Sequence, residues 1–209
     1  MPGTPRKHRW KAYVNPWQPV SPLTRNQKLQ FWLHLEVTSY SPLPTLFGAG
    51  YEQLIDGDPK FGTDSGAFGE RLGAGFLRDA SMRFFVSSAF PAMLHEDPRY
   101  YRKASGPIVR RGLWAGEQAL VTRTDKGRQT VNYSDILGHL AACALTPLYY
   151  PAPSANGRVV VEAWLTSIAG DAGNNLFLEF WPSLRSRWRR HRQRIREQSS
   201  KGPHQPSIP

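Results

Sequence analysis

The residues with the clearest chemical potential are three consecutive metal-ligand types, His95, Glu96 and Asp97. Consecutive side chains on a helix point in different directions, and the metalloprotease spacing of two histidines four residues apart is absent. His34 and His139 belong to other predicted helices and could join His95 only through the tertiary fold. We therefore predict no metal site and no cofactor.

The residues that follow favour a structural role for this segment. Arg99 or Arg102 can pair with a carboxylate, which would make the segment a polar cap on a helix end. Tyr100 and Tyr101 should then pack half-buried, with their hydroxyl groups in water.

Nucleophilic catalysis finds no support, because the chain has no Gly-x-Ser-x-Gly elbow. The glycines near Gly66 and Gly69 lack the preceding strand and the Lys-Ser/Thr ending of a phosphate-binding loop. The single cysteine, Cys143, excludes an intrachain disulfide, and its apolar neighbours indicate a buried structural thiol. The sequence thus favours a non-enzymatic protein and identifies neither a catalytic residue nor a small-molecule substrate.

Charge is the strongest functional signal. The formal net charge is +11, yet residues 1–35 carry six basic residues without an acid, and residues 182–209 carry eight basic residues against Glu197. The segment between them is close to neutral. Two basic ends attract anionic partners such as phospholipid headgroups, nucleic acid or an acidic protein.

The C-terminal basic segment has the pattern of an amphipathic helix over residues 182–198. Its apolar face falls at steps of three and four residues and consists of Trp181, Leu184, Trp188, His191 and Ile195. The arginines occupy the remaining positions: Arg185, Arg187, Arg189, Arg190, Arg192, Arg194 and Arg196. This composition fits an element lying on an anionic membrane surface, whereas nucleic-acid binding and a merely solvated helix remain open alternatives.

Membrane insertion is not expected. Prolines 16, 19 and 22 interrupt any secretory apolar run near the N-terminus, and the chain has no run of 18 apolar residues.

The elements that must position these residues are mostly helices. Residues 1–22 are predicted to form a basic, proline-rich extended arm. Thr24 and Gln27 make a capping box for a helix to about Ser39, which should bury Leu29, Trp32 and Leu33. A second helix is expected over 45–55.

A long central helix is predicted within residues 61–103, kinked by Pro91. Residues 121–133 should form a β-hairpin around Asp125-Lys126-Gly127, and Ser134 should cap the next helix. A last body helix over 159–181 should bury a stripe of Val161, Trp164 or Leu165, Ile168, Ala172 and Leu176.

Small residues predict close helix packing. Gly66, Gly69 and Gly73 make the central helix thin, and Ala169 and Gly173 do the same for the last body helix. We predict that these two thin patches cross each other closely.

The fold class is therefore mainly α: a helical bundle with closely packed Gly/Ala-rich helices, one short β-hairpin and disordered basic termini. The domain plan is an arm (1–22), a single helical domain (23–181), a basic amphipathic helix (182–198) and a disordered tail (199–209).

Several strings resemble those of an uncharacterised bacterial protein family without an established activity. They are His95 to Arg102 (HEDPRYYR), Val121 to Asp125 (VTRTD), Asn132 to Gly138 (NYSDILG), Tyr149-Tyr150-Pro151 and Glu179 to Pro182 (EFWP). The resemblance covers about residues 43–182 and implies no catalytic residue. Members look like exported, envelope-associated proteins with a leader peptide, and this sequence departs from them in showing no recognisable leader.

The leading functional hypothesis is a non-enzymatic helical protein of the bacterial envelope that associates with anionic membrane through its C-terminal helix. The alternative is a cytoplasmic protein that binds nucleic acid or another polyanion through both basic ends.

Overall fold

A computed structural model describes residues 10–37 and 42–200, with side chains as far as residue 196. The fold is mainly α, as predicted. Of the predicted disordered tail 199–209, residues 199 and 200 belong to a helix, and 201–209 lie outside the described residues, as do residues 1–9 at the other end. The helices are α1 (Arg25–Glu36), α2 (Pro42–Ile55), α3 (Ser65–Phe84), the π-helical turn η2 (Phe85–Ala89), α4 (Phe90–Leu94), α5 (Ile108–Glu117), α6 (Tyr133–Leu145), two 3₁₀ turns (Thr146–Leu148 and Ala152–Ser154) and α7 (Gly157–Ser200). The strands are β1 (Tyr13–Val14), β2 (Glu96–Asp97), β3 (Tyr100–Tyr101), β4 (Val121–Thr124) and β5 (Gln129–Val131).

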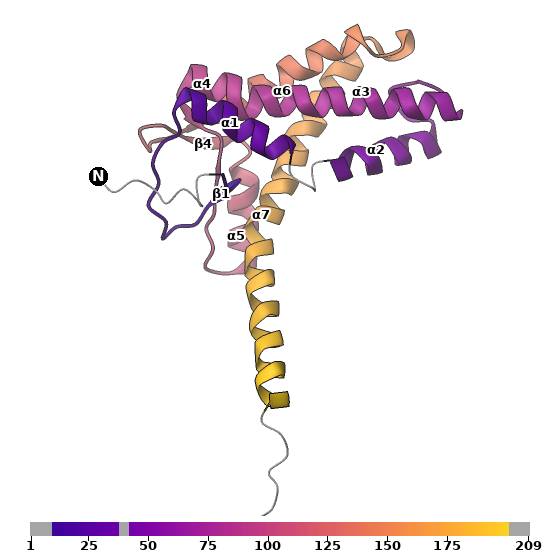
Figure 1. Cartoon of the computed structure of the whole chain (residues 1–209). Helices are drawn as coiled ribbons and strands as arrows, with labels where there is room; N and C mark the ends of the chain where they lie inside the picture. The colour runs from indigo at the N-terminus through magenta and orange to yellow at the C-terminus, as the bar shows by residue number, and fades with distance from the viewer. Residues whose placement is uncertain (1–9, 38–41, 201–209) are drawn as a thin grey trace, which may run out of the picture.

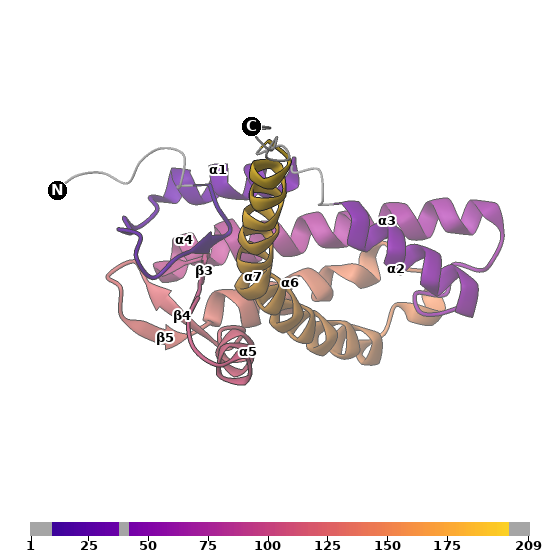
Figure 2. The ribbon, with the colours of Figure 1, turned by 90° about the horizontal axis from the view of Figure 1, so that it is seen from below.

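The elements form a body from which half of one helix projects. Figure 1 shows α1 to α6 gathered around the first half of α7, while its second half points away from them. Figure 2, from below, shows this projecting half foreshortened, with α5 and α6 beside the part of α7 that belongs to the body.

Helix α1 begins where the sequence predicts but buries a different face. Thr24 and Gln27 form the predicted capping box. Leu29 and Leu33 are exposed, whereas Lys28 and Phe31 are buried. The predicted buried face was therefore wrong for Leu29 and Leu33, whereas Trp32 is half-buried against Phe84. Lys28 lies inward instead, where its ammonium group donates to Asp125 Oδ1 at 2.9 Å and to Pro91 O at 3.0 Å.

The central helix is continuous from α3 through η2 to α4 and ends at His95, whose backbone is left-handed with φ of 58°. Pro91 lacks the N–H that would bond to the carbonyl four residues earlier, and the π-helical turn lies directly before it. The structure therefore has a π-helical turn just before Pro91, where the sequence predicted a kink.

The predicted crossing of the two thin patches was wrong. Gly69, Gly73 and Gly173 face open space, since a Cβ added there would meet no neighbouring element within 4 Å among the described residues. Ala169 is also exposed. Gly66 belongs to the capped first turn of α3, where its N–H donates to the N-cap Asp64 at 2.8 Å.

Close backbone approach occurs at two other glycines. A Cβ on Gly75 would lie 2.8 Å from Thr45 Cγ2 of α2. A Cβ on Gly138 of α6 would lie 2.9 Å from Val86 Cγ2 and 3.0 Å from Val86 N, in the π-helical turn. Glycine thus lets α6 approach η2 directly.

Short strands fasten the N-terminal arm and the hairpin to the helices. β4 and β5 form the predicted hairpin, and β2 joins it antiparallel through β4. Between residues 10 and 22 the arm has no helix, but it is extended only in part, since a turn at Asn15–Gln18 follows the short strand β1. It is not separate from the body, because β1 pairs in parallel with β3. Val14 is buried by this pairing.

Helix α7 runs without a break through the predicted boundary at residues 181 and 182. Pro182 lies inside it. The predicted apolar stripe was wrong in part, since Val161, Leu165 and Leu176 are exposed. The inward face is largely polar instead and carries Trp164, Ser167, Asp171, Asn175 and Glu179.

Candidate functional site

The predicted binding residues lie on the projecting half of α7. Trp181, Leu184, Trp188 and Ile195 are exposed to 49%, 55%, 57% and 48%, which is high for such large apolar side chains. All seven arginines from Arg185 to Arg196 are exposed as well. The structure therefore displays the basic amphipathic segment outward.

Aromatic side chains on this segment are stacked. Phe177 and Trp181 lie parallel within 19°, with ring centroids 5.3 Å apart. The Arg192 guanidinium lies 3.8 Å from the centroid of the Trp188 ring, a cation–π geometry. The apolar face thus begins at Phe177, one turn earlier than the sequence analysis placed it.

A buried carboxylate fixes the point from which the helix projects. Glu179 is fully buried and accepts hydrogen bonds from Arg111 Nε at 2.7 Å, Ala104 N at 2.8 Å, and Tyr100 Oη and Lys103 N at 3.0 Å each. Burial alone would raise the pKa of Glu179, but these hydrogen bonds outweigh it and hold the pKa below the ordinary value. Tyr100 therefore donates to a carboxylate inside the protein, and the prediction of a wet hydroxyl was wrong.

The His95 segment is a structural cap, as its residue types suggested. His95 is exposed, while Glu96 and Asp97 are buried. Glu96 accepts from the Ser134 N–H at 2.9 Å, and Asp97 Oδ1 accepts from Arg99 Nε at 2.8 Å. Both carboxylates are used by the fold.

His34 and His139 do not join His95. The centroid of the His34 ring lies 6.3 Å from the centroid of the Trp10 ring. His139 instead meets acids of α6 and α7, a pairing that the sequence analysis did not find.

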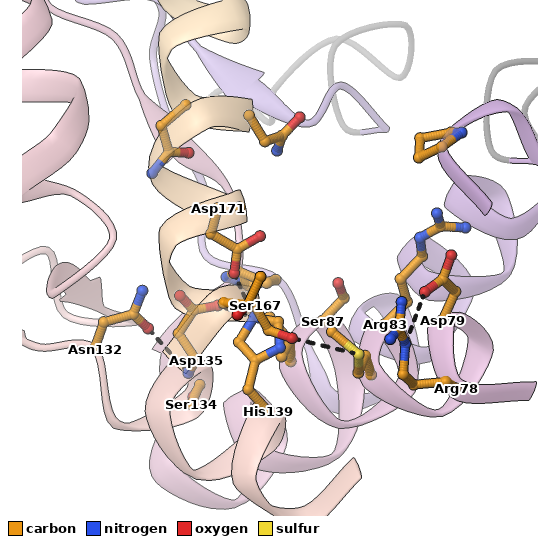
Figure 3. A pocket seen from close by; sticks show the side chains of 18 of the residues that line it. Arg78, Asp79, Arg83, Ser87, Asn132, Ser134, Asp135, His139, Ser167 and Asp171 are labelled. Carbon is orange, nitrogen blue, oxygen red and sulfur yellow. Dashed lines mark hydrogen bonds and ion pairs between the residues drawn. The ribbon is translucent and has the colours of Figure 1, made fainter. Parts of the chain in front are cut away.

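A large cavity lined by both polar and apolar groups lies among α3, η2, α6 and α7. It has a volume of about 820 Å³. Figure 3 shows Asp135, His139 and Asp171 on one side of it and Arg78, Asp79 and Arg83 on the other, with Ser87 between them. Acidic and basic side chains therefore face the same cavity, which is open to solvent on one side.

Asp135, His139 and Asp171 form the tightest polar cluster in this cavity. Asp135 and His139 are four residues apart on α6 and share a face, with His139 Nε2 at 3.7 Å from Asp135 Oδ1. Asp171 of α7 completes the cluster by pairing with His139 Nε2. One potential ligand atom from each residue lies within 4.8 Å of the other two.

The environment of this cluster is acidic. Burial raises the pKa of Asp135 well above its ordinary range, and the carboxyl groups of Asp171 and Glu96 raise it further. Asp135 and His139 are both more than nine-tenths buried. The arrangement can hold a proton between two carboxyl groups, or a cation in its place.

The only sequence signal for this cluster is the Asp-x-x-x-His spacing of residues 135 to 139. It shows that two side chains share a helix face but says nothing of Asp171, which is 32 residues away from His139. A comparison of the chain with protein-family models, curated proteins and solved structures found no match.

Proposed function

We propose that the protein binds anionic membrane surfaces through the projecting half of α7, as a helical, non-enzymatic protein of the cell envelope. The observation that carries the proposal is the simultaneous exposure of an apolar face and seven arginines on a helix that leaves the body. An interfacial helix places its apolar side chains at the boundary of headgroups and acyl chains, while its cationic side chains contact the headgroups.

The apolar face favours lipid over the competing partners. Leu184 and Ile195 are aliphatic and offer no stacking platform for a base, whereas an acyl layer can bury them. The same three-and-four spacing is that of a coiled-coil seam, but pairing two such helices would bring two sets of seven arginines together. Anionic headgroups neutralise this charge.

The test is co-sedimentation of the full chain with vesicles of phosphatidylcholine alone or of phosphatidylcholine with phosphatidylglycerol. We expect binding to the anionic vesicles that weakens with added salt. Replacing Arg189, Arg190 and Arg194 with glutamine should weaken it by about two orders of magnitude, at about 1 kcal/mol for each arginine.

The matched control changes the same net charge on the body. Arg110, Arg128 and Arg158 are exposed there, and their replacement with glutamine should leave binding nearly unchanged. Equal loss in both triple variants would mean that overall charge, rather than the helix, controls binding. Equal binding to neutral vesicles, or tighter binding to a nucleic-acid duplex at the same salt, would contradict the proposal.

A further inference from the structure

The cluster of Asp135, His139 and Asp171 lies outside the membrane-binding helix and has no part in the proposed function. We propose that these three side chains form a binding site for one divalent transition-metal cation, such as Zn²⁺ or Mn²⁺, on the wall of the cavity among α3, η2, α6 and α7. The ligands would be His139 Nε2 and one carboxylate oxygen from each aspartate.

The geometry fits a single ion. Nitrogen and oxygen ligands lie about 2.0–2.2 Å from Zn²⁺, so two ligands of one ion are no more than about 4 Å apart. The separation of 3.7 Å between His139 Nε2 and Asp135 Oδ1 meets this limit. Asp171 Oδ2 contacts the same nitrogen directly, so its partly exposed side chain must move outward to admit an ion. Small side-chain shifts would place all three ligand atoms around one centre.

The charge balance favours a cation. The carboxylates of Asp135 and Asp171 lie on the same nitrogen of His139. Two carboxylates this close repel each other in a buried setting, and a divalent ion converts that repulsion into attraction.

Polar groups in the cavity wall also lack protein partners. Ser134 is 3% exposed and lines the cavity, and within the described part of the chain its Oγ has no hydrogen-bond partner. The same holds for His139 Nδ1. Buried polar atoms are costly to leave unpaired, so their neighbourhood calls for water or a bound ligand.

The ligand set also selects among metals. An imidazole nitrogen suits Zn²⁺, Fe²⁺ or Mn²⁺ better than Mg²⁺ or Ca²⁺, which prefer oxygen ligands. Three protein ligands leave at least one position that faces the cavity, where water or a small anion could bind. Arg78 on the opposite wall is suitably charged to contact such an anion.

The test is isothermal titration of the full chain, freed of metal with a chelator, with ZnCl₂, MnCl₂ and MgCl₂ in turn. We expect one Zn²⁺ or Mn²⁺ per chain and binding of Mg²⁺ that is at least about ten-fold weaker. Asp171→Asn and His139→Gln should each weaken the binding of Zn²⁺ or Mn²⁺ at least about ten-fold. Because Asp171 is partly exposed, its variant should fold even if the His139 variant does not.

Two controls identify the site. His191→Gln removes an exposed histidine on the tail, and Glu162→Gln removes another cavity-lining carboxylate on α7. Both should leave metal binding unchanged. Equal uptake by the wild type and Asp171→Asn would place the metal elsewhere and overturn the proposal. If the wild type binds neither Zn²⁺ nor Mn²⁺, the three residues are only an ion-pair link between α6 and α7.

Discussion

Arg111 Nε donates to Glu179 Oε1 at 2.7 Å, and this ion pair fixes helix α5 to α7 where α7 leaves the body. The Glu179 side chain has no solvent exposure, and that of Arg111 has only 10%. Arg111 Nη2 also donates to the Glu179 carbonyl at 2.9 Å, and Arg102 Nη2 does so at 2.7 Å. The direction of the projecting helix therefore depends on one buried carboxylate and the cations around it.

Glu179→Gln should destabilise the fold strongly. The substitution keeps the shape but leaves the Arg111 guanidinium without its carboxylate, and breaking a buried pair costs about 3–5 kcal/mol. Urea denaturation followed by circular dichroism measures the loss. The matched control is Glu162→Gln on the same helix, whose solvent-exposed pair with Arg158 should contribute little to stability. Equal losses in the two variants would contradict the role given to Glu179.

The same carboxylate should make the protein acid-sensitive. The pKa of Glu179 is depressed below its ordinary 4.5, so the folded state binds the proton less readily than the unfolded state. This stabilisation is complete above the unfolded-state pKa and is lost as the pH falls through the lower folded-state pKa. Denaturation midpoints measured at successive pH values should fall more steeply below pH 4.5 in the wild type than in Glu179→Gln. Parallel curves would refute this assignment.

Substitution of two glycines by alanine should have opposite effects. Gly138→Ala places a methyl group 3.0 Å from the backbone nitrogen of Val86, and such overpacking costs about 1–3 kcal/mol. Gly73→Ala adds a methyl group in open space on a helix and should stabilise by about 0.4–1 kcal/mol. Thermal denaturation of both variants compares the two positions. A destabilised Gly73→Ala would instead support the close crossing predicted from the sequence.

Local features of the fold could be predicted because their causes are local. The capping box needs only Thr24 and Gln27, and the hairpin turn needs only the residues around Gly127, whose φ is 80°. The exposed basic helix follows from its own periodicity. These features depend on residues within a few positions of one another.

The site and the helix faces depend on contacts between distant segments. His139 and Asp171 are 32 residues apart, and Arg111 and Glu179 are 68 apart. Apolar periodicity also misleads here because buried ion pairs replace much of the apolar core, as the inward face of α7 shows. A hydrophobic stripe identifies the buried side of a helix only when that side is apolar.

Helix α1 provides the sharpest test of this point. Lys28 is 1% exposed and pairs with Asp125, whereas its neighbour Leu29 is 43% exposed. Lys28→Ala should therefore cost about 3 kcal/mol or more, because it leaves Asp125 and the Pro91 carbonyl without their shared donor. Leu29→Ala should cost less than about 1 kcal/mol, since the side chain is half in water already. Chemical denaturation of the two variants ranks their losses of stability. A larger loss for Leu29→Ala would mean that the face of α1 that carries Leu29 and Leu33 is the buried one.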